Sequence, residues 1–231
     1  MDNTAAIRIS EREQAIKKWL KELIEEKGAK LPVMPETVYD ALENINVSNA
    51  IKEFAPDITD LQNFINENNA QALVYEWFYD GGEVNNIHAY EGYAYRECIF
   101  DGKPGNTDLL SIDGHDGFEM EPELNEQIND SFGGFCLDPV MNVWYEKLAV
   151  EFSGKFNEYY DLNSKADIEV DLDTVTSAYD ELFHLKLITL IRQAHQKALE
   201  ANPIKIDTGK SFHLFIKRHE RWPMHVLSLN V

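Results

Sequence analysis

The chain has 231 residues, of which 44% are hydrophobic and 11% aromatic, and its formal net charge is -20. This composition is typical of a globular protein with a sizeable core and excludes an intrinsically disordered chain. Two cysteines, Cys98 and Cys136, exclude a disulfide framework or a four-thiolate zinc site. No apolar stretch approaches the ~18 residues of a membrane span, and we expect no secretory signal, because the first residues lack its apolar region. We therefore expect a soluble, cytoplasmic protein with free thiols.

The negative charge is concentrated in the middle of the chain. Residues 31–180 contain 31 acidic and six basic residues, whereas residues 1–30 contain six acidic and seven basic ones, and residues 181–231 four acidic and eight basic ones. A region this acidic repels nucleic acid and anionic membranes, so we expect neither as a direct partner. It favours a basic protein as partner, since complementary charge speeds association and rejects wrong partners. The alternative is that the charge serves solubility alone.

The first expected element is a helix over residues 10–27. Its apolar residues recur at helical spacing and make one continuous face. Ser10 and Glu13 match an S-x-x-E capping box, which predicts the start of the helix at this point. Gly28 suits the left-handed conformation that ends many helices.

Two more helices are expected before the first strand. Pro35 opens a helical pattern over about 36–54, and Asp57 is a good N-cap for the next apolar stripe. Together with the first helix, they make an N-terminal helical part over about 10–68.

The pattern then changes to one typical of strands. Residues 71–80 are rich in aromatic and β-branched side chains, and a turn signal separates them from a return strand over 84–100. A short third strand is expected at 108–112. These three predict an antiparallel meander near 71–112.

Helices return over about 138–201. Asp138 and Pro139 form a cap-plus-first-turn pair for one helix, and Asp173 is placed to cap a second. The second helix is apolar on most sides, which predicts a central position. The last residues, about 211–231, read as two strands joined by a turn.

The order of these elements predicts the fold class. Helices and strands are segregated along the chain, which favours an α+β fold over an alternating nucleotide-binding fold. The sequence contains no glycine-rich phosphate-binding motif, which would have favoured a nucleotide-binding fold. We expect a single domain over residues 1–231, in which an antiparallel sheet, made of the meander and a C-terminal hairpin, packs against several helices.

Residues 111–123, SIDGHDGFEMEPE, contain five carboxylates and no Lys or Arg. The spacing fails the EF-hand template, because counting from Asp113 places His115 at loop position 3 and Leu124 at position 12. His115 is also a poor general base, because neighbouring carboxylates keep an imidazole charged. We expect a solvated acidic loop or an interface here, and no metal or cofactor.

Histidines and aromatic residues give two further sets of candidates. His213, His219 and His225 are spaced by six, but six residues of strand span about 20 Å, so they predict ordinary strand histidines and no zinc site. Alternation along the first strand places three aromatic residues on one face, either as core or as a binding surface. The expected interface combines these aromatic residues with the acidic stretch: Tyr75, Trp77, Tyr79, Asp108, Asp113, Asp116, Glu119, Glu121 and Glu123.

The functional hypothesis is an acidic protein-binding module that neutralises or sequesters a basic partner such as a toxin or nuclease. This physical profile, acidic and without a catalytic motif, is similar to that of bacterial immunity proteins. One alternative is a hydrolase or transferase with a divalent metal held by carboxylates of residues 108–121. Another is a DNA mimic that blocks a nucleic-acid-binding protein. A binding role is favoured over an enzymatic one.

Overall fold

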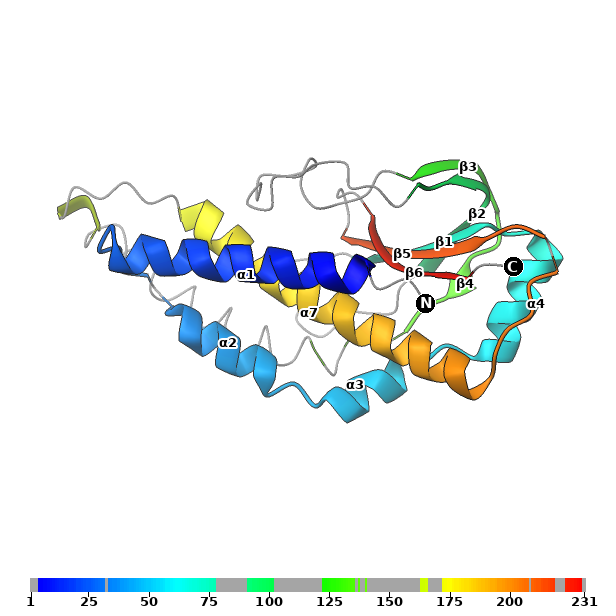
Figure 1. The fold of residues 1–231 in the computed structure, drawn as a ribbon, viewed down its shortest axis with the longest axis horizontal. Coiled ribbons are helices and arrows are strands. Elements are labelled where there is room, and N and C mark those ends of the chain that lie inside the picture. The colour runs from blue at the N-terminus through cyan, green and yellow to red at the C-terminus, as the bar shows by residue number, and fades with distance from the viewer. Residues whose placement is uncertain are drawn as a thin grey trace.

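A computed structural model shows a layer of helices packed against one side of a sheet (Figure 1). It describes residues 4–31, 33–77, 91–101, 122–135, 137, 140, 163–165, 172–207, 209–218 and 223–229.

Helix α1 spans Thr4–Glu25, so it begins well before the predicted capping box. Ser10 therefore lies inside the helix and is not its cap, and this part of the prediction is wrong. The reason is burial: Ala5 and Ile9 extend the apolar stripe of α1 towards its N-terminus and are 4% and 6% exposed. Gly28 follows the helix in the left-handed conformation, with φ 69, as expected.

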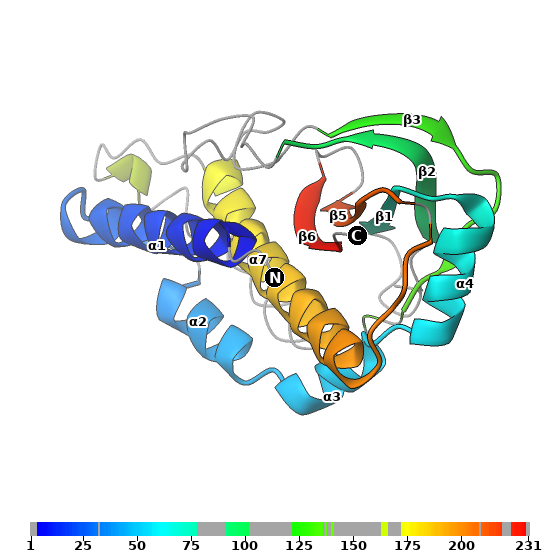
Figure 2. The same cartoon turned by 45° about the vertical axis from the view of Figure 1, so that its right-hand side comes forward.

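The second predicted helix is two helices, α2 over Pro35–Glu43 and α3 over Val47–Glu53. Asn46 separates them, because its side-chain oxygen accepts a hydrogen bond from the backbone N–H of Asn49 at 3.0 Å and starts α3 anew. The break redirects the chain around one end of the central helix, so α2 and α3 both pack against it (Figure 2).

Helix α4 spans Ile58–Asn68, and its predicted cap is confirmed. The Asp57 carboxylate accepts hydrogen bonds from the backbone N–H groups of Thr59 and Asp60. Asn69 ends the helix in the left-handed conformation, with φ 54.

Helix α7 spans Leu172–Ala201 and forms the centre of the helical layer. Its predicted position is confirmed, and it contacts α1, α2, α3 and the last strand of the sheet. Most of its side chains are buried, as expected from a helix that is apolar on most sides. Among the described helices, none combines the length and the apolar composition needed to cross a membrane.

Within the described residues, the sheet has six strands, in the order β3-β2-β1-β5-β6, with β4 also paired to β2. Their bounds are β1 Ala72–Trp77, β2 Glu91–Ile99, β3 Glu123–Gln127, β4 Phe132–Gly133, β5 Phe212–Arg218 and β6 Met224–Leu229. The C-terminal hairpin, β5 and β6, is confirmed.

The sheet is mixed, which corrects the predicted antiparallel sheet. Strand β1 pairs with β2 in antiparallel orientation but with β5 in parallel orientation, from Ala72↔His213 to Trp77↔Arg218. A parallel pair needs a long crossover connection, and the chain between β1 and β5 includes α7. The predicted strand at 108–112 and the predicted helix near 138–160 lie outside the described residues, apart from Val140.

The two faces of the sheet have different surroundings. The helix-facing side joins the main core through Leu73 and Tyr75 of β1 and alternate residues of β5. The opposite side, here called the second face, has a small cluster of its own: Ala72, Val74 and Phe215. Gly92 allows β2 to curve closely over the helix-facing side, because a Cβ there would lie 2.7 Å from the Leu73 side chain.

Candidate functional site

The described residues include three of the nine predicted interface residues. Glu123 is the first residue of β3 and is exposed, Tyr75 lies inside β1, and Trp77 is the last residue of β1. The other six lie outside the described residues: Tyr79, Asp108, Asp113, Asp116, Glu119 and Glu121.

Tyr75 is a core residue and not part of a binding surface. Its side chain is 1% exposed, and its ring contacts those of Phe135 and His195, with centroids 4.9 and 5.9 Å away. Burial raises the pKa of the Tyr75 hydroxyl far above its usual value. Strand alternation correctly separates the two faces of β1, but it does not tell which of them the helices cover.

Glu123 belongs to an exposed surface at the edge of the sheet, which we call the acidic edge: Glu97, Ile99, Glu123 and Glu126. Ile99 is 63% exposed, an unusual value for an isoleucine, and it lies directly opposite Glu123 in the β2–β3 register. Glu97, two residues before Ile99 on β2, and Glu126, further along β3, are also exposed. Apolar contact area bordered by charge is typical of protein-binding surfaces.

A local change of the β2–β3 ribbon produces this exposure. Glu126 has φ 56, which is rare for a residue with a side chain, and the register places it opposite Arg96. Past this point, Cys98 and Leu124 pack against the second-face cluster, and Ile99 points to solvent. The ribbon curves over the sheet here (Figure 2). The curvature therefore turns an apolar side chain outward on the edge of the sheet.

The position of β3 at the end of the strand order adds a second means of recognition. Among the described strands, none pairs with the outer side of β3, and backbone N–H and C=O groups on such a side can pair with another chain. Such a strand can accept an extended segment of another protein, with side chains of that segment meeting the acidic edge. Arg96, next to the edge, donates a hydrogen bond to the Asn68 carbonyl at 3.2 Å, which ties the ribbon to the end of α4.

The second face contains a histidine–serine–histidine network. The Ser228 hydroxyl oxygen lies 2.8 Å from Nδ1 of His213 and 2.8 Å from Nε2 of His225. A β-bulge makes this possible, because the β5–β6 register shifts between Leu214 and Phe215. Without the shift, side chains three apart on β6 would point to opposite faces. The expectation that these histidines lie far apart is therefore wrong for one pair, since β-pairing brings His213 and His225 together.

The single proton of the Ser228 hydroxyl restricts how the network can be hydrogen-bonded. A hydroxyl donates one proton, so Ser228 can donate to one imidazole nitrogen and must accept from the N–H of the other. Burial lowers the pKa of His213, which favours its neutral form. The network thus satisfies polar groups of a partly buried surface, and Phe100 packs against both imidazole rings at 5.3 and 4.8 Å.

An ion pair borders the same face. The Lys217 ammonium lies 2.8 Å from the Glu76 carboxylate, and the two residues are direct neighbours in the parallel β1–β5 register. Burial, followed by the charge of Glu76, raises the pKa of Tyr95. Cys98 is a free thiol, and burial raises its pKa to about 11, so it is protonated and unreactive at neutral pH.

No metal site is found within the described part of the chain, where no three His, Cys, Asp or Glu side chains are grouped to hold an ion. The carboxylates proposed for a metal, at 108–121, lie outside these residues. The acidic edge combines exposure, negative charge and an apolar contact.

Sequence reasoning identified Glu123 but missed the other members of the acidic edge. Ile99 and Glu97 were assigned to a strand, and nothing in strand alternation indicates that β2 reverses its exposed side near Arg96. An available signal was the run Arg96–Glu97, two charged residues in succession, which an uninterrupted half-buried strand rarely contains.

Comparisons with protein families, with curated proteins and with solved structures gave no match to this chain. The function must therefore be argued from the site alone.

Proposed function

We propose that the protein binds a basic partner protein through the acidic edge and thereby neutralises or sequesters it. The observation that carries this proposal is the exposed Ile99, which lies opposite Glu123 and is accompanied by two further exposed glutamates. A partner with lysines or arginines around an apolar pocket fits this surface. The binding is proposed for the cytoplasm.

The charge of the whole chain supports the same partner class. Residues 31–180 contain 31 acidic and six basic residues, and the acidic edge belongs to this region. Long-range attraction would steer a basic protein towards this region, whereas burial of Ile99 would hold the complex once formed. Association should therefore depend on salt, and dissociation on the apolar contact.

The test is capture of a basic protein by the tagged full chain at low salt, followed by kinetics with the captured protein. The edge variant replaces three carboxylates: E97Q, E123Q and E126Q. The control variant makes the same change of charge at three exposed glutamates of the helices: E11Q, E53Q and E200Q. We expect the edge variant to reduce the association rate about tenfold and flatten its salt dependence, and the control variant to change either much less.

A third variant, Ile99→Ser, separates the effect of charge on association from the effect of the apolar contact on dissociation. We expect it to raise the dissociation rate with little effect on association, because it removes apolar area and no charge. Equal effects of the edge and control variants would mean that net charge alone attracts the partner, and the acidic edge would then not be the binding site. Replacing Asp113, Asp116 and Glu119 by their amides tests whether the acidic stretch before β3 extends the same surface.

A further inference from the structure

The two strands at the ends of the strand order, β3 and β6, differ in their exposure to solvent. Among the described strands, neither has a neighbour on its outer side. In β6, residues 224–227 are buried and the last two are partly exposed, so this end of the sheet is covered. In β3, four of the five residues are exposed, and Leu124 is partly exposed. Of these two strands, β3 is therefore the one that another chain can reach.

The backbone of β3 directs alternate N–H and C=O groups away from the sheet. The Ile128 N–H donates to the Ala94 carbonyl of β2 at 2.8 Å. In an antiparallel pair, residues whose backbone groups face the partner strand alternate with residues whose groups point the other way. The β2–β3 register has no shift, so Leu124, an even number of residues before Ile128, also faces β2. The N–H and C=O groups of Glu123 and Asn125 therefore point to the outer side of β3.

The side chains of β3 alternate between two surfaces of different chemistry. Cross-strand partners share a face of the sheet, so Glu123 lies on the same side as its partner Ile99 and as Glu97. Leu124 lies on the opposite side and packs against the second-face cluster. A strand added along β3 would thus meet carboxylates and an exposed isoleucine on one side, and a leucine on the other.

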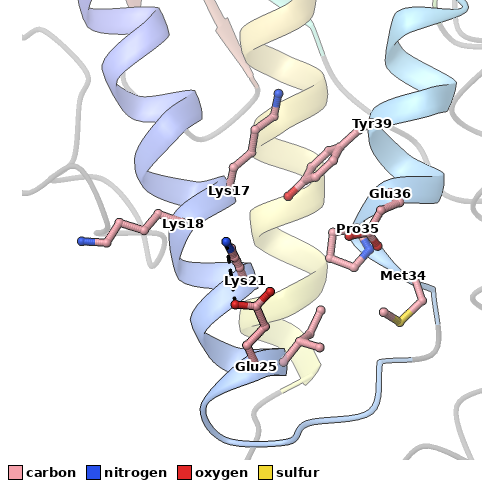
Figure 3. Close-up of a pocket in the computed structure, with 9 residues that line it drawn as sticks. Lys17, Lys18, Lys21, Glu25, Met34, Pro35, Glu36 and Tyr39 are labelled. Carbon is pink, nitrogen blue, oxygen red and sulfur yellow. Dashed lines mark ion pairs between the residues drawn. The ribbon is translucent and has the colours of Figure 1, made fainter.

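The hollow between α1 and α2 has no comparable means of binding an extended segment (Figure 3). Its lysines, Lys17, Lys18 and Lys21, are each paired with a glutamate of α1, so their charges are compensated within the helix. Its walls are helical, and a helical backbone forms its hydrogen bonds within itself and has no strand edge. The open backbone groups of β3 therefore distinguish the acidic edge from this hollow.

Charge determines which segment fits the outer side of β3. A second copy of the chain would bring the same carboxylates to the edge, and each copy has a net charge of -20, so pairing of β3 with itself is opposed. A neutral segment would remove water from the carboxylates without supplying a counter-charge. A segment with basic side chains on the side of Glu123 and apolar ones on the side of Leu124 satisfies both surfaces.

We propose that β3 binds an extended segment of the basic partner as an added strand, in which basic side chains alternate with apolar ones. The main-chain groups of Glu123 and Asn125 form the hydrogen bonds, and the side chains on either face provide the selectivity. Glu126, with φ 56, limits regular pairing to the part of β3 that precedes it. This inference rests on the proposed function for the charge of the partner, and adds the conformation in which the partner binds.

The first experiment is an NMR titration of the isotope-labelled full chain with a blocked peptide of alternating lysine and valine, at pH 7 and physiological salt. The control peptide has the same sequence and charge but contains D-valine, so its side chains cannot alternate between the two faces of a strand. We expect the all-L peptide to bind about tenfold more tightly. Its binding should slow hydrogen exchange at the amides of Glu123 and Asn125, and change that of Leu124 much less, because Leu124 faces β2.

Two variants at one position separate the backbone from the side chain. Asn125→Pro removes the outward N–H and places a ring on the open side of β3, and it removes no hydrogen bond to β2. Asn125→Ala removes the side chain and keeps the N–H. We expect the proline variant to weaken peptide binding about tenfold and the alanine variant to leave it within about twofold. Circular dichroism checks that both are folded, and if the proline variant is not, exchange at the Asn125 amide of the wild type decides.

The results that refute strand addition differ from those that refute the proposed function. Equal affinity for the two peptides, binding of neither, or unchanged exchange at Asn125 would each overturn strand addition. The proposed function would survive these results, because carboxylates can also attract a folded basic surface. It fails instead if the edge and control glutamine variants affect association of the captured protein equally.

Discussion

The two faces of the sheet are stabilised by different kinds of side chains. On the helix-facing side, Leu214 and Ile216 of β5 join a continuous apolar core beneath α7. On the second face, Phe215 belongs to a cluster of three buried apolar residues, next to an ion pair and a histidine–serine network. One face is stabilised by apolar area and the other also by matched polar partners, so we expect them to respond differently to mutation and pH.

The largest expected difference comes from two phenylalanines of the same strand. Phe212 on the helix-facing side and Phe215 on the second face are 1% and 0% exposed, so burial alone does not distinguish them. Phe212→Ala should lower the free energy of unfolding by about 3–5 kcal/mol. Phe215→Ala should lower the free energy of unfolding by less, because the residues around its cluster are only partly buried and water can enter the cavity that the ring leaves. Urea unfolding measures both, and an equal or larger loss for Phe215→Ala would show that the second face is as much a core as the first.

The next effect is a dependence on pH that belongs to the helix-facing side. His195 Nδ1 donates to the Ile191 carbonyl at 3.0 Å, while its Nε2 is buried and has no hydrogen-bond partner among the described residues. Burial lowers the pKa of His195 to about 4, although the bond to Ile191 acts in the opposite direction. The folded state therefore binds fewer protons than the unfolded state, whose value is about 6.5. The contribution to stability is full above pH 6.5 and is lost as the pH falls towards 4.

The expected loss from this group is about 2 kcal/mol between pH 7 and pH 5. Unfolding of the wild type and of His195→Phe at both pH values measures it, since the variant should lack this part of the pH dependence. His213→Phe is the matched test on the second face. Its effect should be smaller, because His213 is only half-buried and hydrogen-bonds to Ser228. A variant at His195 that keeps the full wild-type pH dependence would contradict the prediction.

The smallest expected effect concerns the ion pair of the second face. Lys217→Met leaves the Glu76 carboxylate without this partner, and the two side chains are 29% and 13% exposed. We expect a loss of about 1–2 kcal/mol, between the values for surface and fully buried pairs. Adding Glu76→Gln should restore part of the loss, since it removes the charge that had lost its partner. No recovery in the double variant would mean that Lys217 stabilises the sheet through its hydrocarbon chain.

Local patterns in the sequence predicted the elements best where the pattern was long. The helix that became α7 was found because its apolar character continues over many residues, and the hairpin of β5 and β6 was found as two strands around a turn. The start of α1 was missed because a local cap signal at Ser10 was weaker than burial of Ile9 against distant residues. Helix boundaries of this kind depend on tertiary packing, which a single element does not encode.

Local sequence patterns could not predict which strands pair or which side chains of the sheet are exposed. The parallel β1–β5 pair joins residues as far apart as Ala72 and His213, and neither strand indicates its neighbour. The bulge that brings Ser228 to His225 is likewise a property of two paired strands. Of the candidate site, the sequence predicted an acidic interface and Glu123, while the outward position of Ile99 follows from the curvature of β2 and β3.

The parallel pairing of β1 with β5 also determines the order in which the protein can form during synthesis. Ala72 leaves the ribosome 141 positions before its partner His213, so the side of β1 that pairs with β5 stays unpaired while α7, the central helix, is still being made. Closure of such a non-local contact is slow, because a long loop must be ordered first. We expect the hairpin of β5 and β6 to dock last, so nascent chains that end before Phe212 should depend on chaperones that shield the waiting strand.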